Sequence, residues 1–155
     1  MKPRRALIVT TVLAVAFVVS GFSRPSVVAG VGPAVAAQQL TIWDGVFTTE
    51  QATRGEKIYA DGCARCHGEG LQGVEAAPAL TGPTFYAMWE GETLDALFER
   101  MRSSMPQDAP GSLSRAQNAD VLAYMLKTGG YPAGQAALDP QAGALARIKV
   151  LMYRP

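Results

Sequence analysis

The chain has 155 residues, enough for one ordinary domain. Its formal net charge of +1 hides an uneven distribution, because four basic residues and no acidic residue precede residue 38. Residues 38–155 carry 10 basic and 13 acidic side chains, a net charge of −3, and no basic cluster. This distribution argues against a nucleic-acid-binding protein.

The first 37 residues have the pattern of an export signal. A basic start, MKPRR, precedes an uncharged apolar stretch at 6–23 and the small residues Ala34-Val35-Ala36. This pattern is typical of a secretory signal peptide cleaved near Ala36 or Ala37. The apolar stretch also reaches the lower length limit of a membrane-spanning helix, so a retained anchor is the alternative. In both cases we expect the rest of the chain to lie outside the cytoplasmic membrane.

The first predicted helix begins after Thr48, which forms a capping signal with Gln51. Gly62 is its predicted end. The residues of this segment at helical spacing are Ala52, Gly55, Ile58 and Tyr59.

Two further segments also have helix caps and an apolar face. One begins after Thr93 and carries an apolar stripe at i, i+3, i+4 and i+7, formed by Leu94, Leu97, Phe98 and Met101. The other opens with the capping box Ser114 and Gln117, and ends at Gly129-Gly130. Its apolar face contains Val121, Leu122, Met125 and Leu126.

The segments between and after these helices are rich in glycine and proline. Residues 69–85 have no clear period and are predicted to be a loop, as are residues 104–113. In the tail after residue 131, residues 142–152 are predicted to pack on the body as a short helix or a strand. Short helices joined by long loops make a thin core. A large apolar cofactor would organise such loops.

Both cysteines and the only histidine lie within five residues, CARCH, at 63–67. A disulfide between Cys63 and Cys66 would close a very small loop, for which stabilisation is least. A thioredoxin-like dithiol needs a βαβ context, which is absent from the predicted elements. A zinc site ordinarily has four protein ligands, and the chain has no second Cys/His pair. The favoured interpretation is covalent haem, for which C-x-x-C-H is the known attachment pattern.

The spacing of CARCH suits haem for a physical reason. At the end of a helix, residues 63 and 66 lie one turn apart and project to one side. Two thioether bonds can then join the vinyl groups along one edge of the porphyrin, and His67 can place its imidazole under the iron as an axial ligand. We therefore predict one haem c, bound covalently through Cys63 and Cys66.

Because His67 is the only histidine in the chain, the sixth iron ligand is predicted to be a methionine or water. Most methionines fill cores, and Met101 and Met125 lie on apolar helical stripes. Met105 instead lies in a loop, beside Pro106, which stiffens the backbone. Met105 is the predicted ligand; the alternatives are Met101, an open or water-ligated iron, and the remaining methionines, Met88, Met125 and Met152. A His/Met pair raises the reduction potential and leaves no open site, which favours an electron carrier over an enzyme.

Over about residues 41–131 the chain resembles the class I (mono-haem) c-type cytochromes. GEKIYADGCARCHG is similar to that family's first helix and haem site, MPQDAPGSLS to its methionine loop, and DVLAYML to its last helix. The resemblance implies an all-α cytochrome c fold, with three to four short helices wrapped round one covalent haem. It also implies that the first and last helices cross, with Gly55, Tyr59 and Tyr124 at the contact. WDGVFTTEQATRG and SMPQDAPGSLSRAQNADVLAYMLKTGGYPAG more narrowly resemble small periplasmic cytochromes associated with bacterial dehydrogenases, including quinoprotein alcohol dehydrogenases.

The resemblance implies roles for further residues around the haem. Pro78 to Leu80, PAL, is similar to the loop whose proline carbonyl accepts a hydrogen bond from the axial histidine. Trp89 would reach a haem propionate through its indole N–H, with core packing as the alternative. Tyr86 and Arg100 are further candidates for the propionates.

The resemblance also implies a division of the chain and a function. We expect a signal peptide or retained anchor at 1–37, an N-terminal extension at 38–48, a cytochrome c domain at 49–131 and a tail at 132–155. The expected function is electron transfer in the periplasm, anchored to the membrane only if the N-terminal segment is retained. A dehydrogenase would be the donor, and an oxidase or another cytochrome the acceptor. The alternatives are a cytochrome subunit of a periplasmic dehydrogenase complex and a haem-based ligand sensor; no catalytic residues for substrate oxidation are recognisable.

Overall fold

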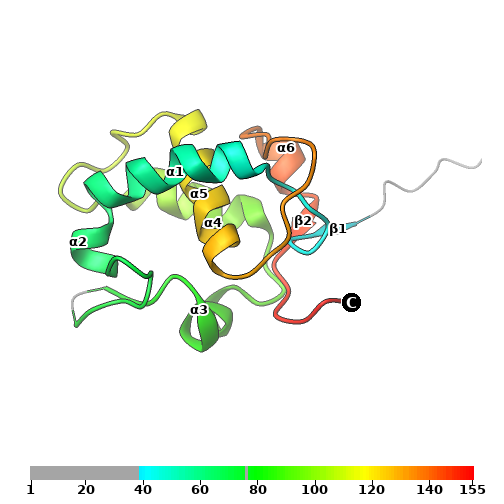
Figure 1. Cartoon of the computed structure of the whole chain (residues 1–155), viewed down its shortest axis with the longest axis horizontal. Helices are drawn as coiled ribbons and strands as arrows, with labels where there is room; N and C mark the ends of the chain where they lie inside the picture. Colours follow the sequence, from blue (N-terminus) through cyan, green and yellow to red (C-terminus); the bar gives the residue numbers. More distant parts are fainter. Residues whose placement is uncertain (1–38, 76) are drawn as a thin grey trace, which may run out of the picture. The chain divides into compact units, whose positions relative to one another are not determined.

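A computed structural model describes residues 39–75 and 77–155, and the expected signal or anchor at 1–37 lies outside these residues. The described chain is mostly helical, which confirms the predicted fold class (Figure 1). Its helices are α1 (Thr49–Gly62), α2 (Ala64–His67), α3 (Gly82–Trp89), α4 (Leu94–Ser104), α5 (Arg115–Thr128) and α6 (Ala142–Leu145). Two strands of two residues each, β1 (Leu40–Thr41) and β2 (Ile148–Lys149), complete it. Of the helices in these residues, none has the length and apolar character to cross a membrane.

Side-chain caps determine where the three predicted helices begin. Thr48 and Thr93 each accept a hydrogen bond, at 3.2 Å, from the backbone N–H three residues further on. Ser114 and Gln117 form the complete reciprocal capping box at the start of α5. Each cap satisfies backbone N–H groups that have no partner inside the helix.

Helix α3 corrects one prediction, because residues 82–85 were expected to belong to a loop. Thr81 is extended at the N-cap, and Pro83 lies in the first turn. Proline is tolerated there, since an N–H in the first turn has no intrahelical acceptor. The glycine and proline that suggested a loop therefore mark the start of a short helix, which buries Phe85.

Helices α1 and α5 cross at very close range (Figure 1). A Cβ atom on Gly55 would lie 1.8 Å from the carbonyl oxygen of Asp120, so only glycine permits this approach. The rings of Tyr59 and Tyr124 meet one turn further on, with centroids 5.2 Å apart. Arg54 adds two hydrogen bonds to the Asp120 carboxylate, at 2.8 and 2.9 Å. The structure thus has the crossing that the family resemblance implied.

The N-terminal extension and the C-terminal tail pair with each other near the start of α1. β1 and β2 are parallel, with Leu40 opposite Ile148. The side chain of Gln51 donates to the Leu138 carbonyl at 3.1 Å and accepts from its N–H at 2.7 Å. Because Leu145, Ile148 and Val150 are all buried, the tail contributes to the core. The tail therefore contains both a short helix and a strand, the two alternatives considered for residues 142–152.

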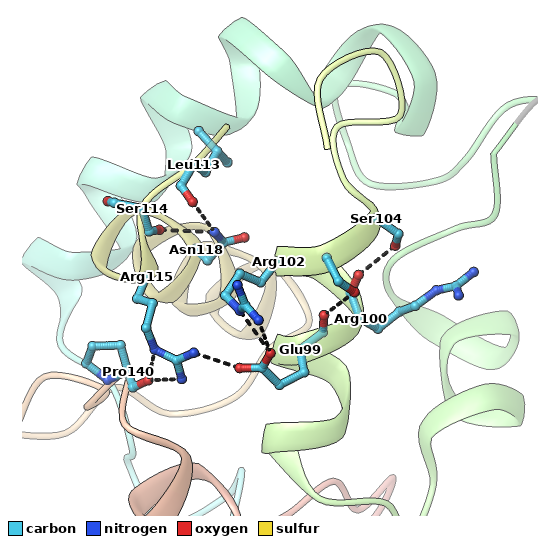
Figure 2. Close-up of polar contacts among 10 residues, drawn as sticks. Glu99, Arg100, Arg102, Ser104, Leu113, Ser114, Arg115, Asn118 and Pro140 are labelled. Atoms are coloured by element: carbon cyan, nitrogen blue, oxygen red, sulfur yellow. Dashed lines mark hydrogen bonds and ion pairs between the residues drawn. The ribbon is translucent and has the colours of Figure 1, made fainter. Parts of the chain in front are cut away.

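Glu99 joins α4 to α5, and Arg115 extends this link to the tail (Figure 2). The Glu99 carboxylate accepts hydrogen bonds from Arg102 at 2.9 Å and Arg115 at 2.7 Å, which hold its pKa below the ordinary value. Arg115 also donates to the carbonyl of Pro140 at 2.9 Å. Solvent screens these partly exposed groups, so the ion pairs themselves add little stability. In Figure 2 the guanidinium of Arg100, a candidate propionate ligand, points away from Glu99.

Replacing Gly55 by alanine tests the helix crossing. The new methyl group would collide with the backbone of Asp120, so we expect the free energy of unfolding to fall by about 1–3 kcal/mol. Urea denaturation followed by circular dichroism measures this change. The matched control is Gly143→Ala in α6, where a Cβ would meet no atom within 4 Å. Equal stability of Gly55→Ala and wild type would contradict the close crossing.

Candidate functional site

CARCH lies where α1 ends and α2 begins. Cys63 caps the C-terminus of α1, and its N–H donates to the Tyr59 carbonyl at 2.8 Å. The next turn is also helical, since the N–H of His67 donates to the Cys63 carbonyl at 3.0 Å. Both thiols are free: Cys63 is partly buried, which raises its pKa, and Cys66 is exposed. Two thiols are therefore one helical turn apart, without a disulfide between them.

The imidazole of His67 is oriented by a backbone carbonyl. Its Nδ1 lies 2.8 Å from the carbonyl oxygen of Pro78, which can only accept a hydrogen bond. Nδ1 therefore carries the hydrogen, and Nε2 of the neutral ring keeps its lone pair for another partner. Metal-binding histidines are characteristically held in this way. With only 9% of its surface exposed, His67 is a buried side chain whose free nitrogen fits an axial iron ligand.

Residues 68–75 and 77–80 belong to the loop that brings the Pro78 carbonyl to His67. The N–H of Gly73 donates to the His67 carbonyl at 2.8 Å, and the N–H of Leu80 donates to the Leu71 carbonyl at 2.9 Å. Gly73 has φ 75°, and a Cβ there would lie 2.6 Å from a backbone nitrogen across the loop. Leu71 is completely buried. The loop is therefore folded back on itself, and this return places Pro78 against the imidazole.

Tyr59 connects the helix crossing to the CARCH segment. Its ring is 1% exposed, and its hydroxyl donates to the carbonyl of Gly68 at 2.7 Å. Burial raises the pKa of Tyr59 to about 12. A neutral, buried hydroxyl thus fixes the backbone directly after His67.

A small apolar pocket with three hydroxyl-bearing side chains lies between Leu80, α3 and the C-terminal end of α5. The hydroxyl of Tyr131 donates to that of Tyr86 at 2.6 Å; burial and this hydrogen bond raise the pKa of Tyr131. The pocket's volume of about 10 Å³ is room for one water molecule and not for a large ligand. Trp89 is partly buried against the core. The lining residues are Leu80, Thr81, Phe85, Tyr86, Met125, Leu126, Gly129 and Tyr131.

Met105 follows the last residue of α4, in an extended conformation. It is partly buried, and its N–H donates to the Met101 carbonyl at 2.9 Å. Of the alternatives, Met101 packs against the core, and Met125 is buried, with 3% exposed. Met105 thus lies at the C-cap of α4, outside the buried core of the helices.

The segment that carries Met105 is joined to CARCH by a contact that sequence reasoning missed. Arg65 forms an ion pair with Asp108, three residues after Met105. The Tyr59–Gly68 and Tyr86–Tyr131 hydrogen bonds were missed too. These partners have no local pattern that links them, because only the folded chain brings them together.

The described residues fit a covalently bound haem. Two free thiols one turn apart and a buried histidine with an available Nε2 are features that this cofactor requires. A thioether side chain on a second loop, Met105, supplies a further possible ligand.

The chain is similar to a known protein family and to two known proteins. Residues 50–125 match the model of a family described as cytochrome C oxidase, cbb3-type, subunit III. Over 78 residues the chain is 36% identical to a thiosulfate dehydrogenase of Stutzerimonas stutzeri (strain A1501), a match that covers 46% of this chain and 25% of that protein. Among solved structures, the chain is similar to the crystal structure of the sulfane dehydrogenase SoxCD from Paracoccus pantotrophus, with a TM-score of 0.46 and 22% identity. That similarity covers 66% of this chain and 59% of the other. The chain thus spans about a quarter of the length of its curated relative.

Removing the Tyr59 hydroxyl tests its link to the CARCH segment. Tyr59→Phe leaves the Gly68 carbonyl without its hydrogen bond, so we expect unfolding to require about 1–3 kcal/mol less free energy at neutral pH. The wild type should lose this advantage as the pH rises from 10 towards 12, because the unfolded tyrosine ionises before the folded one. Urea denaturation over this pH range measures both effects. Tyr124→Phe, in the neighbouring ring, is the control; an equal loss there would contradict a specific role for the Tyr59 hydroxyl.

Proposed function

Residues 50–125 of this chain form a domain of the c-type cytochrome family, and from this premise we propose that the protein is an electron carrier of the periplasm. The carrier would cycle one covalently bound haem c between Fe(II) and Fe(III). The observation that carries the proposal is the orientation of His67, whose Nδ1 is held by Pro78 and whose Nε2 is available for a metal. The haem supplies the redox-active iron, and the residues of the chain bind and orient it.

Each site residue has a role in this proposal. Cys63 and Cys66 would hold the haem covalently through thioether bonds, and His67 and Met105 would ligate its iron. The Pro78 carbonyl holds the histidine ring in its ligating orientation. Of the remaining candidates, Leu80 would supply apolar lining, and Trp89 would donate its indole N–H to a propionate, with packing against the core as its alternative role.

His/Met ligation explains why the protein would be a carrier and not itself an enzyme. A soft thioether stabilises ferrous iron relative to ferric iron and so raises the reduction potential. With both axial positions filled by the protein, an electron can enter and leave with little rearrangement. Substrate would then have no open coordination site.

The periplasm and a dehydrogenase partner belong to the same proposal. The export pattern of residues 1–37 supports the location. The match to a protein named thiosulfate dehydrogenase supports a dehydrogenase as electron donor, with an oxidase or another cytochrome as acceptor. The same match favours a second candidate function, in which the chain is a stable cytochrome subunit of a dehydrogenase complex.

Substitution of single methionines tests the proposed ligation. In the oxidised protein, Met105→Ala should abolish the near-red absorption band of the methionine–iron bond and lower the reduction potential, because the soft ligand is lost. Met101→Ala and Met125→Ala are matched controls that should keep the band. A band unchanged in Met105→Ala would contradict this ligation. Rapid carbon monoxide binding by the reduced wild type would favour a ligand sensor instead.

Purification from native membranes and periplasm separates the two candidate functions. A free carrier should elute alone, at the mass of one chain with one haem. Stable co-elution with a large catalytic subunit would establish the second candidate.

A further inference from the structure

One ion pair connects the two segments that carry the proposed axial ligands. Arg65 lies in α2, two residues before His67, and Asp108 lies three residues after Met105. The Arg65 and Asp108 side chains are 58% and 56% exposed, and an ion pair joins them directly. Their contact therefore joins the haem-attachment turn, residues 63–67, to the methionine loop, residues 105–113.

The rest of the methionine loop is bonded mainly to itself. The N–H of Ala109 donates to the Pro106 carbonyl at 3.0 Å, and that of Ser112 to the Ala109 carbonyl at 3.2 Å. The far end is held by Asn118, which donates to the Leu113 carbonyl at 3.1 Å. Between Met105 and Leu113, within residues 39–75 and 77–155, the Arg65–Asp108 pair is the one polar side-chain contact with the CARCH segment.

We propose that Arg65 and Asp108 form a latch that keeps the methionine loop against the haem-attachment turn and thereby keeps external ligands from replacing Met105 at the iron. This proposal rests on the proposed His/Met ligation. Movement of the methionine loop would carry the Met105 sulfur away from the iron and admit another ligand. A contact that favours the closed loop lowers the fraction of molecules in the open form.

The magnitude of this effect follows from the exposure of the pair. An exposed ion pair adds little to the free energy of unfolding of the whole protein. Opening one loop costs far less free energy than unfolding the whole protein, so the same small contribution matters more for the loop. The apparent affinity for an external ligand is proportional to the open fraction. Loss of the latch should therefore raise that affinity about two- to fivefold.

Imidazole binding to the oxidised, haem-loaded protein tests the latch. We expect Arg65→Ala and Asp108→Ala each to bind imidazole about two- to fivefold more tightly than wild type at low salt. The double variant should resemble the single ones, because both remove the same contact. High salt should bring the wild type towards the variants, since salt screens exposed charges.

A charge exchange and a matched control make the test specific. The double variant Arg65→Asp/Asp108→Arg should restore wild-type imidazole affinity, which a purely steric role of either side chain would not allow. The control is Arg102→Ala, which breaks an exposed ion pair with Glu99 inside α4. It should leave imidazole affinity unchanged.

Three outcomes overturn the latch. One is unchanged imidazole affinity in both single variants while the wild type shows the methionine band. Another is an equal effect of Arg102→Ala, and a third is failure of the charge exchange to restore affinity. Absence of the methionine band from the wild type would instead refute the His/Met ligation, and the latch with it.

Discussion

The position of the CARCH segment depends on a contact between two backbones, those of α1 and α5 at Gly55 and Asp120. No side chain separates the helices there, since a Cβ on Gly55 would overlap the Asp120 carbonyl. This contact sets the line along which α1 runs, and therefore where its last turn delivers Cys63. Tyr59, one turn beyond Gly55, packs on Tyr124 and binds the backbone after His67, so the same crossing reaches the proposed iron ligand.

The site also requires the loop after His67 to fold back, so that the Pro78 carbonyl reaches the imidazole. An imidazole has two nitrogen atoms, and the atom available to iron is decided by the partner of the other one. Here that partner is the carbonyl of Pro78, held in place because the backbone doubles back at Gly73. The proposed haem site therefore depends on residues that would not touch the iron, and the proposed latch between Arg65 and Asp108 would extend this dependence to the methionine side.

The extension and tail supply much of the packing at the end of α1 that is remote from CARCH. A small domain that wraps a large cofactor has limited apolar area between its helices. The tail adds Leu138, Leu145, Ile148 and Val150 to the core, while Gln51 binds it through two hydrogen bonds. The resemblance to known cytochromes offered no counterpart for this segment, yet its packing is continuous with that of the helices.

Local chemistry made part of this protein predictable from its residues alone. A threonine or serine cap acts on N–H groups two or three positions away, so the starts of α1, α4 and α5 could be predicted directly. The five residues of CARCH likewise predict a covalently attached haem by themselves. Helix α3 was partly missed because the same Gly and Pro residues occur in loops and in first turns. The Tyr59–Gly68, Arg65–Asp108 and Tyr86–Tyr131 contacts, and the pairing of β1 with β2, could not be predicted. Their partners have no shared periodicity, and their proximity depends on how the helices cross and how the loops return, which only the tertiary structure decides.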